Sequence, residues 1–261
     1  MKVIYDVGAN VGQDVEYYLM KADKVVTIDA DPNALEELKS RFKAQCLSGR
    51  LAVVHAAIHS KGGTVPFFVN RKSSILSRLH TGPELWEYYG EVCSPDAFEE
   101  IRVPTAKLSD IIHEHGDPHF IKIDVEGADE LATQDLFEAQ IRPKFISVEF
   151  SFSYVCACYL YLMGYRDFQV IDQALHESNF NQHKITTLDG SATTYDFSYH
   201  SSGPFGDDLP GGWIDFETLC FILSSHKLRE KGHWFDIHAK LSELRVTSLL
   251  TTVFGIPAGS L

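Results

Sequence analysis

Apolar runs typical of buried strands alternate with helix-like segments through residues 1–172 of the 261-residue chain. We expect strands at 2–6, 24–29, 51–58, 60–69, 120–127, 145–150 and 166–172. Apolar residues at helical spacing predict helices at 11–22, 31–42, 106–116, 129–137 and 153–164. Strands separated by helices are typical of a largely parallel sheet covered by helices on both faces. The pattern therefore predicts an α/β fold.

Two stretches interrupt this alternation. Residues 70–104 show no clear period, and the rhythm is lost again from residue 173. Within the second stretch, 194–213 is rich in glycine, proline and aromatic residues, which predicts a long ordered loop with a functional role. We expect a core at 1–172 and an extension at 173–261 that completes the sheet and caps a binding site. The apolar stretch 246–254 is expected to pack on the core or on a partner chain.

Composition limits the classes of function. Apolar residues make up 44% of the chain and charged residues 23%, which is ordinary for a globular protein. The formal net charge of -13 argues against nucleic acid as a partner, because phosphate binding requires a basic surface. Five scattered cysteines without a CxxC motif indicate reduced thiols and a cytoplasmic location. No signal peptide is expected, and no apolar run is long enough to cross a membrane, so no membrane partner is expected either.

A glycine-rich turn, DVGANVG at residues 6–12, follows the first predicted strand. Ligands of open parallel sheets bind beyond the carboxyl ends of the strands, where Gly8 and Gly12 permit close approach and unusual backbone torsions. Asn10 tolerates the left-handed region. The dinucleotide fingerprint GxGxxG fits poorly here. The carboxylate of Asp6 suits a ligand with a positive group better than a pyrophosphate.

A second carboxylate, Asp29, ends the second predicted strand. A carboxylate at that position accepts hydrogen bonds from ribose hydroxyls. The two carboxylates together favour an adenosine with a cationic tail, which is the form of S-adenosylmethionine. A turn that holds no ligand is the alternative interpretation.

Three segments resemble the FkbM family of S-adenosylmethionine-dependent methyltransferases. They read DVGANVGQ, VVTIDADPNALEEL and FIKIDVEGAD, and the third is the most specific because the family's pattern there is close to KIDVEGxE. The resemblance covers roughly residues 1–172. The chain departs from the family at Asp29, where the family often has glutamate, and at Asp129, the last position of the third pattern.

The resemblance implies a class I methyltransferase fold, Rossmann-like, with S-adenosylmethionine as the cofactor. It places the methionine part at the glycine turn, the ribose at Asp29 and the adenine beside Ala57 and Ile58. Ser74 matches a serine pair in the family's variable loop less closely. The expected cofactor-binding residues are Asp6, Gly8, Ala9, Asn10, Gly12, Asp29, Ala30, Asp31, Ala57, Ile58, Ser74 and Asp124.

Transfer of a methyl group to a hydroxyl benefits from a general base. Asp124, Glu126 and Glu149 lie near the ends of two predicted strands and are the candidate catalytic residues. Asp124 and Glu126 share one face if the strand continues to residue 126. Alternatively, Glu126 caps the following helix, and Glu149 pairs with Lys122 or Lys144. Such a cluster also suits Mg²⁺ or Ca²⁺, but no complete ligand set can be identified, so no metal is predicted.

The C-terminal extension offers side chains for an acceptor. We expect the substrate-binding residues to be His200, Trp213, His233 and His238. A secondary core over the sheet is the alternative for these aromatic residues. The predicted function is O-methylation of a hydroxyl on a sugar or specialised metabolite, a small-molecule acceptor. An NAD-dependent oxidoreductase and a non-catalytic adenosyl-binding module are the rival hypotheses. The sequence predicts no oligomeric state.

Overall fold

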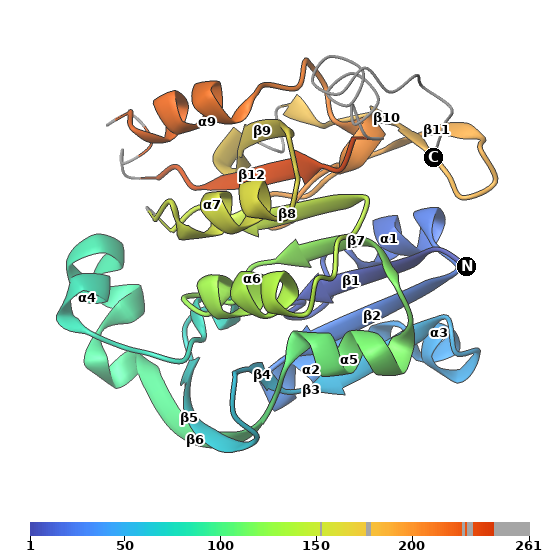
Figure 1. Ribbon diagram of the computed structural model, residues 1–261. Coiled ribbons are helices and arrows are strands. Elements are labelled where there is room, and N and C mark those ends of the chain that lie inside the picture. The colour runs from blue at the N-terminus through green and yellow to red at the C-terminus, as the bar shows by residue number, and fades with distance from the viewer. Residues whose placement is uncertain (152, 176–178, 226–227, 229–231, 243–261) are drawn as a thin grey trace.

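A seven-stranded sheet forms the centre of the computed structural model, which describes residues 1–151, 153–175, 179–225, 228 and 232–242 (Figure 1). Its strands are, in spatial order, β3 (Leu51–His55), β2 (Lys24–Asp29), β1 (Val3–Val7), β7 (Pro118–Ile123), β8 (Phe145–Glu149), β12 (Phe235–Lys240) and β9 (Asp167–Asp172). Neighbours from β3 to β8 run parallel, whereas β12 is antiparallel to both β8 and β9. The predicted largely parallel sheet is confirmed.

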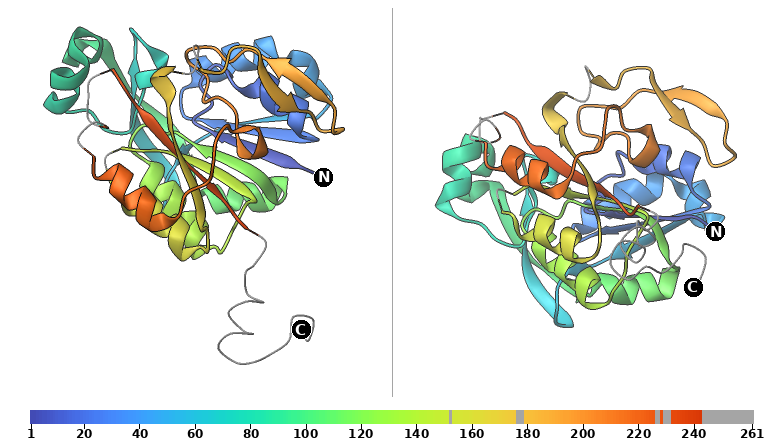
Figure 2. Two further views of the ribbon diagram at one scale, coloured as in Figure 1. Left: turned by 90° about the horizontal axis from the view of Figure 1, so that it is seen from above. Right: turned by 45° about the horizontal axis from the view of Figure 1, so that its top comes forward.

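Helices cover both faces of the sheet (Figure 2). One face packs against α5 (Leu108–His115), α6 (Asp129–Glu138), α7 (Val155–Leu162) and α9 (Phe216–Leu223). The other packs against α1 (Val15–Lys21), α2 (Pro32–Arg41) and part of the C-terminal extension, with α3 (Lys43–Leu47) following α2. The alternation along each strand divides the core in two, because successive side chains point to opposite faces. Every residue of β1 is buried, as its apolar run predicts.

The segment 51–58 was predicted to be one strand, but it forms two strands that belong to different sheets. After β3, the N–H of Ala56 donates to the carbonyl of Asp29 at 3.0 Å, and the chain leaves the main sheet. The next residues form β4 (Ala57–Ile58), which joins β6 (Phe98–Ala106) and β5 (Gly63–Asn70) in a three-stranded sheet. This separation places Ala57 and Ile58 beside the carboxyl ends of β1 and β2.

The stretch 70–104, which lacked a period, contains short elements and most of β6. Its elements before β6 are η1 (Ser74–Leu76), α4 (Pro83–Tyr89), η2 (Gly90–Cys93) and η3 (Pro95–Ala97). Helices of one or two turns are too short to show a hydrophobic period. They project beyond the carboxyl edge of the sheet, where α4 stands apart in Figure 1.

The C-terminal extension supplies β12, which sequence analysis did not identify as a strand. Apolar Phe235, Ile237 and Ala239 alternate with polar residues, a period of two that fits a strand. Its apolar side chains join the core on the α6 and α7 face. The remaining described elements of the extension are η4 (Gln173–Leu175), β10 (His183–Thr186), β11 (Ala192–Tyr195) and η5 (Gly206–Asp208). The stretch 246–254 lies outside the described residues.

The predicted loop at 194–213 is a packed part of the fold and includes the end of β11. Phe205 stacks on Phe120 of β7 with ring centroids 3.9 Å apart. Asp14, just before α1, accepts hydrogen bonds from the hydroxyl of Ser201 and the N–H of Ser202. Aromatic packing and buried hydrogen bonds therefore fix this segment, which we call the cap, against α1 and the sheet.

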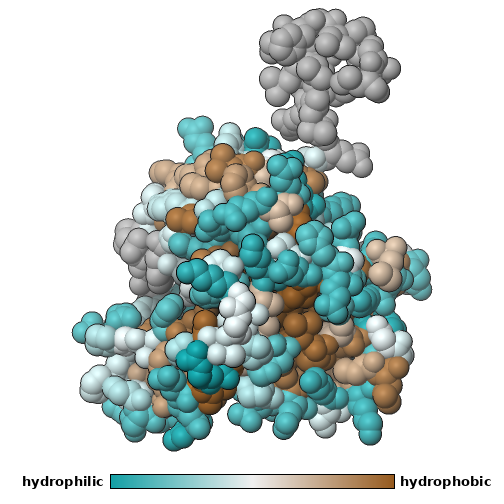
Figure 3. Space-filling model, turned by 60° about the horizontal axis from the view of Figure 1, so that its bottom comes forward, coloured by the Kyte–Doolittle hydropathy of each residue, from teal (hydrophilic) through white to brown (hydrophobic). Residues whose placement is uncertain are grey.

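The described residues contain no helix long and apolar enough to cross a membrane. On the face shown in Figure 3, hydrophilic side chains are interspersed with smaller apolar groups. All five cysteines are free thiols, and only Cys93 and Cys156 are buried.

Candidate active site

The glycines of the turn after β1 serve the packing of the fold. A Cβ on Gly8 would lie 1.7 Å from the carbonyl oxygen of Asp124, at the end of β7. A Cβ on Gly12 would lie 3.1 Å from the side chains of Val15 and Leu38. Both glycines have positive φ, 89° and 79°. At both positions neighbouring protein atoms lie where a side chain would begin, so the glycines are required by the packing of the turn.

Asn10 carries the polar function of this turn. It adopts a φ of 45°, as its tolerance of the left-handed region predicts. Its side chain is 9% exposed, and neither amide atom has a hydrogen-bond partner among the described residues. A buried amide without protein partners is costly unless a ligand supplies them. Asn10 therefore fits a polar ligand at this edge of the sheet.

Asp29 fixes the turn from β2. Its two oxygens accept the N–H groups of Asn10 at 2.7 Å and of Asp31 at 2.8 Å. Burial raises the pKa of this carboxyl despite these hydrogen bonds. Each carboxylate oxygen has a second lone pair, so Asp29 can still accept hydrogen bonds from a ligand.

A cavity of about 90 Å³ opens beside this turn. Eight residues expected to bind the cofactor line it: Gly8, Asn10, Asp29, Ala30, Ala57, Ile58, Ser74 and Asp124. The lining of this cavity also includes residues that were not predicted from the sequence: Gln13, Ala56, Phe67, Ser77, Leu79, Lys122 and Ala128. Several of these come from β5 and the stretch after it, where the sequence showed no period. Apolar walls with a few convergent polar groups are typical of a small-molecule site.

Four residues expected to touch the cofactor lie outside this lining. Ala9 is buried in the core and Gly12 packs against α2. The side chain of Asp31 accepts the N–H of Asn33 at 2.9 Å and so caps α2. Asp6 belongs to β1 and lies next to Lys122 of β7 in the sheet. Its side chain contacts that lysine and does not reach the cavity lining.

Lys122 gathers three carboxylates under the cavity. Its Nζ lies 3.6 Å from Asp6, 3.8 Å from Asp14 and 3.5 Å from Asp124. Burial raises the pKa of Asp6 to about 7, although Lys122 opposes this shift. Burial disfavours the ammonium of Lys122, but the surrounding carboxylates outweigh burial and raise its pKa.

The strand before Glu126 ends sooner than predicted. β7 stops at Ile123, and Glu126 has a φ of 48° in the loop that follows. Asp129 holds this loop, because its oxygens accept the N–H groups of Val125 at 3.0 Å and Gly127 at 3.2 Å. Burial raises the pKa of Asp129 to about 6. The aspartate that departs from the family pattern therefore organises the loop between Asp124 and α6.

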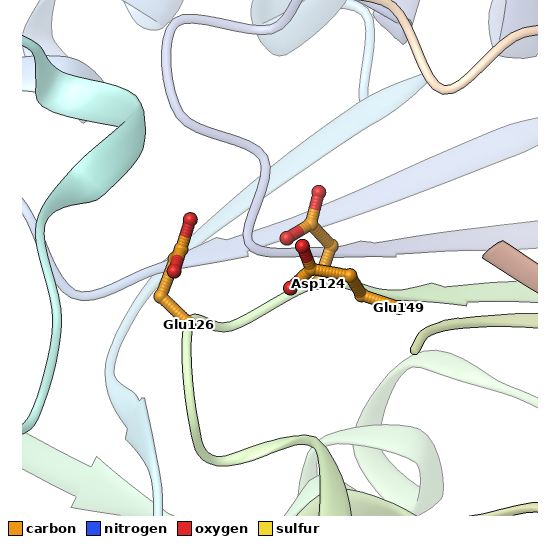
Figure 4. Close-up of side chains that lie close together, drawn as sticks. All are labelled: Asp124, Glu126 and Glu149. Carbon is orange, nitrogen blue, oxygen red and sulfur yellow. The ribbon is translucent and has the colours of Figure 1, made fainter. Parts of the chain in front are cut away.

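The three candidate catalytic carboxylates converge despite the shorter strand (Figure 4). One oxygen from each of Asp124, Glu126 and Glu149 lies within 4.8 Å of the others. Glu126 does not cap α6, because it pairs with Arg78 instead. Glu149 forms no ion pair with a described residue. Its two predicted partners pair elsewhere: Lys122 with Asp6, Asp14 and Asp124, and Lys144 with Asp207 at 4.0 Å. Burial raises the pKa of Glu149 well above its ordinary value.

A second cavity of about 360 Å³ adjoins these carboxylates. Its lining includes the three carboxylates together with His200 and His233, as predicted, and His233 lies 2.7 Å from Asp172. The lining of the larger cavity also includes residues that were not predicted as substrate contacts: Tyr88, Tyr89, Gln173, Tyr199, Trp234 and Asp236. Asp236 could have been found from the sequence, because apolar and polar residues alternate over 235–240 and this alternation predicts a strand.

Trp213 and His238 do not line this cavity, which corrects two predicted acceptor contacts. Trp213 lies under Lys240, whose Nζ is 4.8 Å from its ring centroid, and packs against the core beneath the cap. His238 is buried within β12, opposite Ser147 of β8 and Gln169 of β9. The alternative interpretation, a secondary core over the sheet, describes the position of Trp213, whereas His238 lies within the sheet itself.

The order of the seven strands, with β12 antiparallel between β8 and β9, is that of the class I methyltransferase fold. The family model of the methyltransferase FkbM domain matches residues 6–181. The chain therefore belongs to the FkbM methyltransferase family, whose enzymes take the methyl group from S-adenosylmethionine. This membership replaces the rival hypothesis of an NAD-dependent oxidoreductase.

Solved structures give weaker similarities. Methyltransferase FkbM from Methylobacillus flagellatus KT shares 17% identity and a TM-score of 0.44 over 66% of this chain and 39% of its own. The chain thus spans well under half the length of that protein. Precorrin-6y C5,15-methyltransferase from Geobacter metallireducens GS-15 shares 11% identity over 92% of this chain and 80% of its own, with a TM-score of 0.40. No curated protein matches the sequence significantly.

Proposed function

We propose that this chain methylates a hydroxyl group of a small acceptor, a sugar or specialised metabolite, with S-adenosylmethionine as the donor. The observation that carries the proposal is a shared wall between the two cavities. Ile75, Asp124, Glu126 and His200 line both of them. A donor in the first cavity and an acceptor in the second would meet at this wall, and alignment of the reacting atoms supplies much of the rate.

The smaller cavity fits the donor. Asn10 offers an unpartnered buried amide, and Asp29 has lone pairs left for ribose hydroxyls. Ile58, Phe67 and Leu79 provide apolar surface for the adenine ring. When bound, S-adenosylmethionine supplies a methyl group activated by a sulfonium. Gly8 lies where there is no room for a side chain, and it keeps the turn close to the end of β7.

The carboxylates on the other side supply the base. The bound donor would supply the methyl group and keep the electron pair on its sulfur, and one of these carboxylates would take the proton that the acceptor hydroxyl loses. Glu149 suits this role because burial raises its pKa well above its ordinary value, which strengthens its affinity for a proton. Asp124 and Glu126, which have cationic partners, would orient the acceptor.

The test is transfer of a deuterated methyl group to a panel of hydroxyl-bearing sugars and metabolites. We expect formation of S-adenosylhomocysteine together with a product whose new methyl group lies on oxygen, as determined by mass spectrometry and NMR. Glu149→Gln should lower the turnover strongly, whereas Asp207→Asn, an exposed carboxylate, should not. A methyl group found on nitrogen would contradict the proposal, and donor binding without turnover would favour the non-catalytic adenosyl-binding module.

The setting of the reaction is also part of the proposal. A net charge of -13 and an acidic cavity favour a small molecule over nucleic acid as the acceptor. Free thiols match the reducing cytoplasm. Fractionation of the native host cells would test the location, and recovery of the protein with a membrane fraction would contradict it.

A further inference from the structure

Two carboxylates of the larger cavity lie opposite each other, and the nearest cations, Arg78 and Lys122, form their ion pairs with other carboxylates. Glu149 of β8 and Asp236 of β12 are directly opposite in the antiparallel register. Neither side chain has a hydrogen bond or ion pair to a described residue, although Asp236 is only 3% exposed. Burial raises the pKa of both groups well above the ordinary value. Like charges placed directly opposite across two strands are destabilising, so this pair needs a reason beyond stability.

The cations near the cavity are already engaged. Arg78 pairs with Glu126, and Lys122 lies between Asp6, Asp14 and Asp124. No lysine or arginine is among the described residues that line the larger cavity. Glu149 and Asp236 do not line the smaller cavity either, so a donor bound there would be separated from them by Asp124 and Glu126, which line both cavities.

Aromatic side chains form the rest of the wall. Tyr88, Tyr89, Tyr199 and Trp234 line the larger cavity, and the rings of Tyr199 and Trp234 meet edge to face at 5.6 Å. Faces of such rings attract cations, most strongly where water is excluded. Gln173 adds a buried amide whose Nε2 has no hydrogen-bond partner among the described residues and can donate to an oxygen of the occupant. The wall therefore offers contacts for a cation and for a neutral oxygen.

A metal ion suits these carboxylates less well. A divalent cation needs several oxygens around one point, and the close group consists of Asp124, Glu126 and Glu149. Two of these three already have a cationic side chain beside them. Asp236, which has no hydrogen bond or ion pair to a described residue, does not belong to the close group. The unmatched charge is thus spread along the cavity wall, which suits an organic cation.

We propose that the acceptor carries a protonated amine besides the hydroxyl that receives the methyl group, as an amino sugar or an aminocyclitol does. The amine lies between Glu149 and Asp236, and the aromatic rings cover the apolar faces of the acceptor. This inference rests on the proposed function, since it names the class of acceptor for the same site.

The first experiment measures the charge preference of the cavity without any acceptor. Trp86→Phe and Trp213→Phe leave Trp234, in the cavity wall, as the only tryptophan. We expect caesium ions to quench its fluorescence several-fold more strongly than iodide. Glu149→Gln with Asp236→Asn should remove this preference. The matched control, Glu99→Gln with Asp207→Asn, removes two exposed charges and should leave it intact. Equal quenching by both ions, or stronger quenching by iodide, would overturn the inference.

The second experiment identifies the kind of cation. Binding of matched sugars, glucosamine against glucose and galactosamine against galactose, is measured by calorimetry in the presence of S-adenosylhomocysteine. We expect the amine to bind at least about tenfold more tightly, and the Glu149→Gln, Asp236→Asn variant to lose the difference. A panel in which no amine outbinds its hydroxyl counterpart would overturn the inference. Saturable binding of Mg²⁺ or Ca²⁺ that Glu149→Gln abolishes would assign the charge to a metal and also overturn it.

These experiments separate the two proposals. Fluorescence quenching and sugar binding do not depend on methyl transfer, so they report on the cation even if the product assay fails. Conversely, methylation of a neutral hydroxyl compound by a cavity without cation preference would leave the proposed function standing and remove the amine.

Discussion

The α-carbon of Gly8 faces the carbonyl oxygen of Asp124 so closely that an added Cβ would lie 1.7 Å from it. A backbone carbonyl held in a strand end cannot move aside, so the turn and β7 fit together only with glycine at this position. The contact joins the glycine turn of the predicted cofactor site to Asp124, one of the candidate catalytic carboxylates.

Gly8→Ala should therefore destabilise the protein by roughly 3 kcal/mol or more, from overpacking together with a positive φ. Urea unfolding followed by circular dichroism measures the loss. Gly49→Ala is the matched control, because Gly49 has a φ of 76° but no atom within 4 Å of an added Cβ. It should lose only about 1–2 kcal/mol. Equal losses in the two variants would show that backbone strain alone accounts for the effect.

Asp29→Asn should weaken binding of S-adenosylhomocysteine by roughly 1–3 kcal/mol, because a charge-assisted partner of the ribose is replaced. Calorimetry measures the change. A 2′,3′-dideoxy analogue should bind the wild-type protein less tightly but show no further loss with the variant. Asp31→Asn, which alters the cap of α2 outside the cavity, serves as the control. A further loss of affinity for the analogue in Asp29→Asn would exclude Asp29 as the ribose partner.

Asp129→Ala should loosen the loop that carries Glu126, because the N–H groups of Val125 and Gly127 lose their acceptor. We expect a loss of about 1–3 kcal/mol in the free energy of unfolding and faster hydrogen exchange at these two amides. Glu130→Ala, the next residue in α6, should change neither. Unchanged exchange at Val125 and Gly127 would mean that Asp129 does not hold the loop.

The pH dependence of stability should reveal Asp6. Its pKa is raised from 3.8 to about 7 by burial, so the folded protein keeps a proton that the unfolded chain releases between these values. The contribution of Asp6 to stability is thus present below about pH 4 and is lost as the pH rises toward 7. Asp6→Asn should flatten the decline in this window, measured by urea unfolding at several pH values. Asp110→Asn, an exposed position, should leave the decline as it is. A slope that Asp6→Asn leaves unchanged would assign the pH dependence to other groups.

Trp234 and Trp213 should differ in their effect on the acceptor. Trp234 lines the larger cavity, whereas Trp213 packs beneath Lys240 outside it. Trp234→Ala should raise the acceptor KM by about tenfold, equivalent to roughly 1–2 kcal/mol of lost ring contact, with little change in cofactor affinity. Trp213→Ala should reduce stability and leave the KM nearly unchanged. The reverse pattern in steady-state kinetics would return Trp213 to the acceptor site.

Local patterns in the sequence were sufficient for six of the seven strands of the main sheet and for much of the smaller cavity. Apolar runs and helical spacing located the six parallel strands of the main sheet, since burial on both faces leaves a continuous apolar signal. The turn at Asn10 and the strand end at Asp29 could be identified because ligands meet parallel strands at their carboxyl ends. The predicted convergence of Asp124, Glu126 and Glu149 depended on the same rule, although the strand ends before Glu126.

Only the tertiary structure decided the composition of the larger cavity. Asp236 meets Glu149 because β12 enters the sheet between two strands that precede it in the chain, and no local pattern specifies the partner of a strand. The same insertion buries His238 between β8 and β9, and Trp234, just before β12, lies in the cavity wall. The sequence by itself determined the fold class and the edge of the sheet where the chemistry lies, because both follow from local periodicity. Packing between distant segments determined which side chains line the larger cavity, since long-range pairing depends on the whole chain.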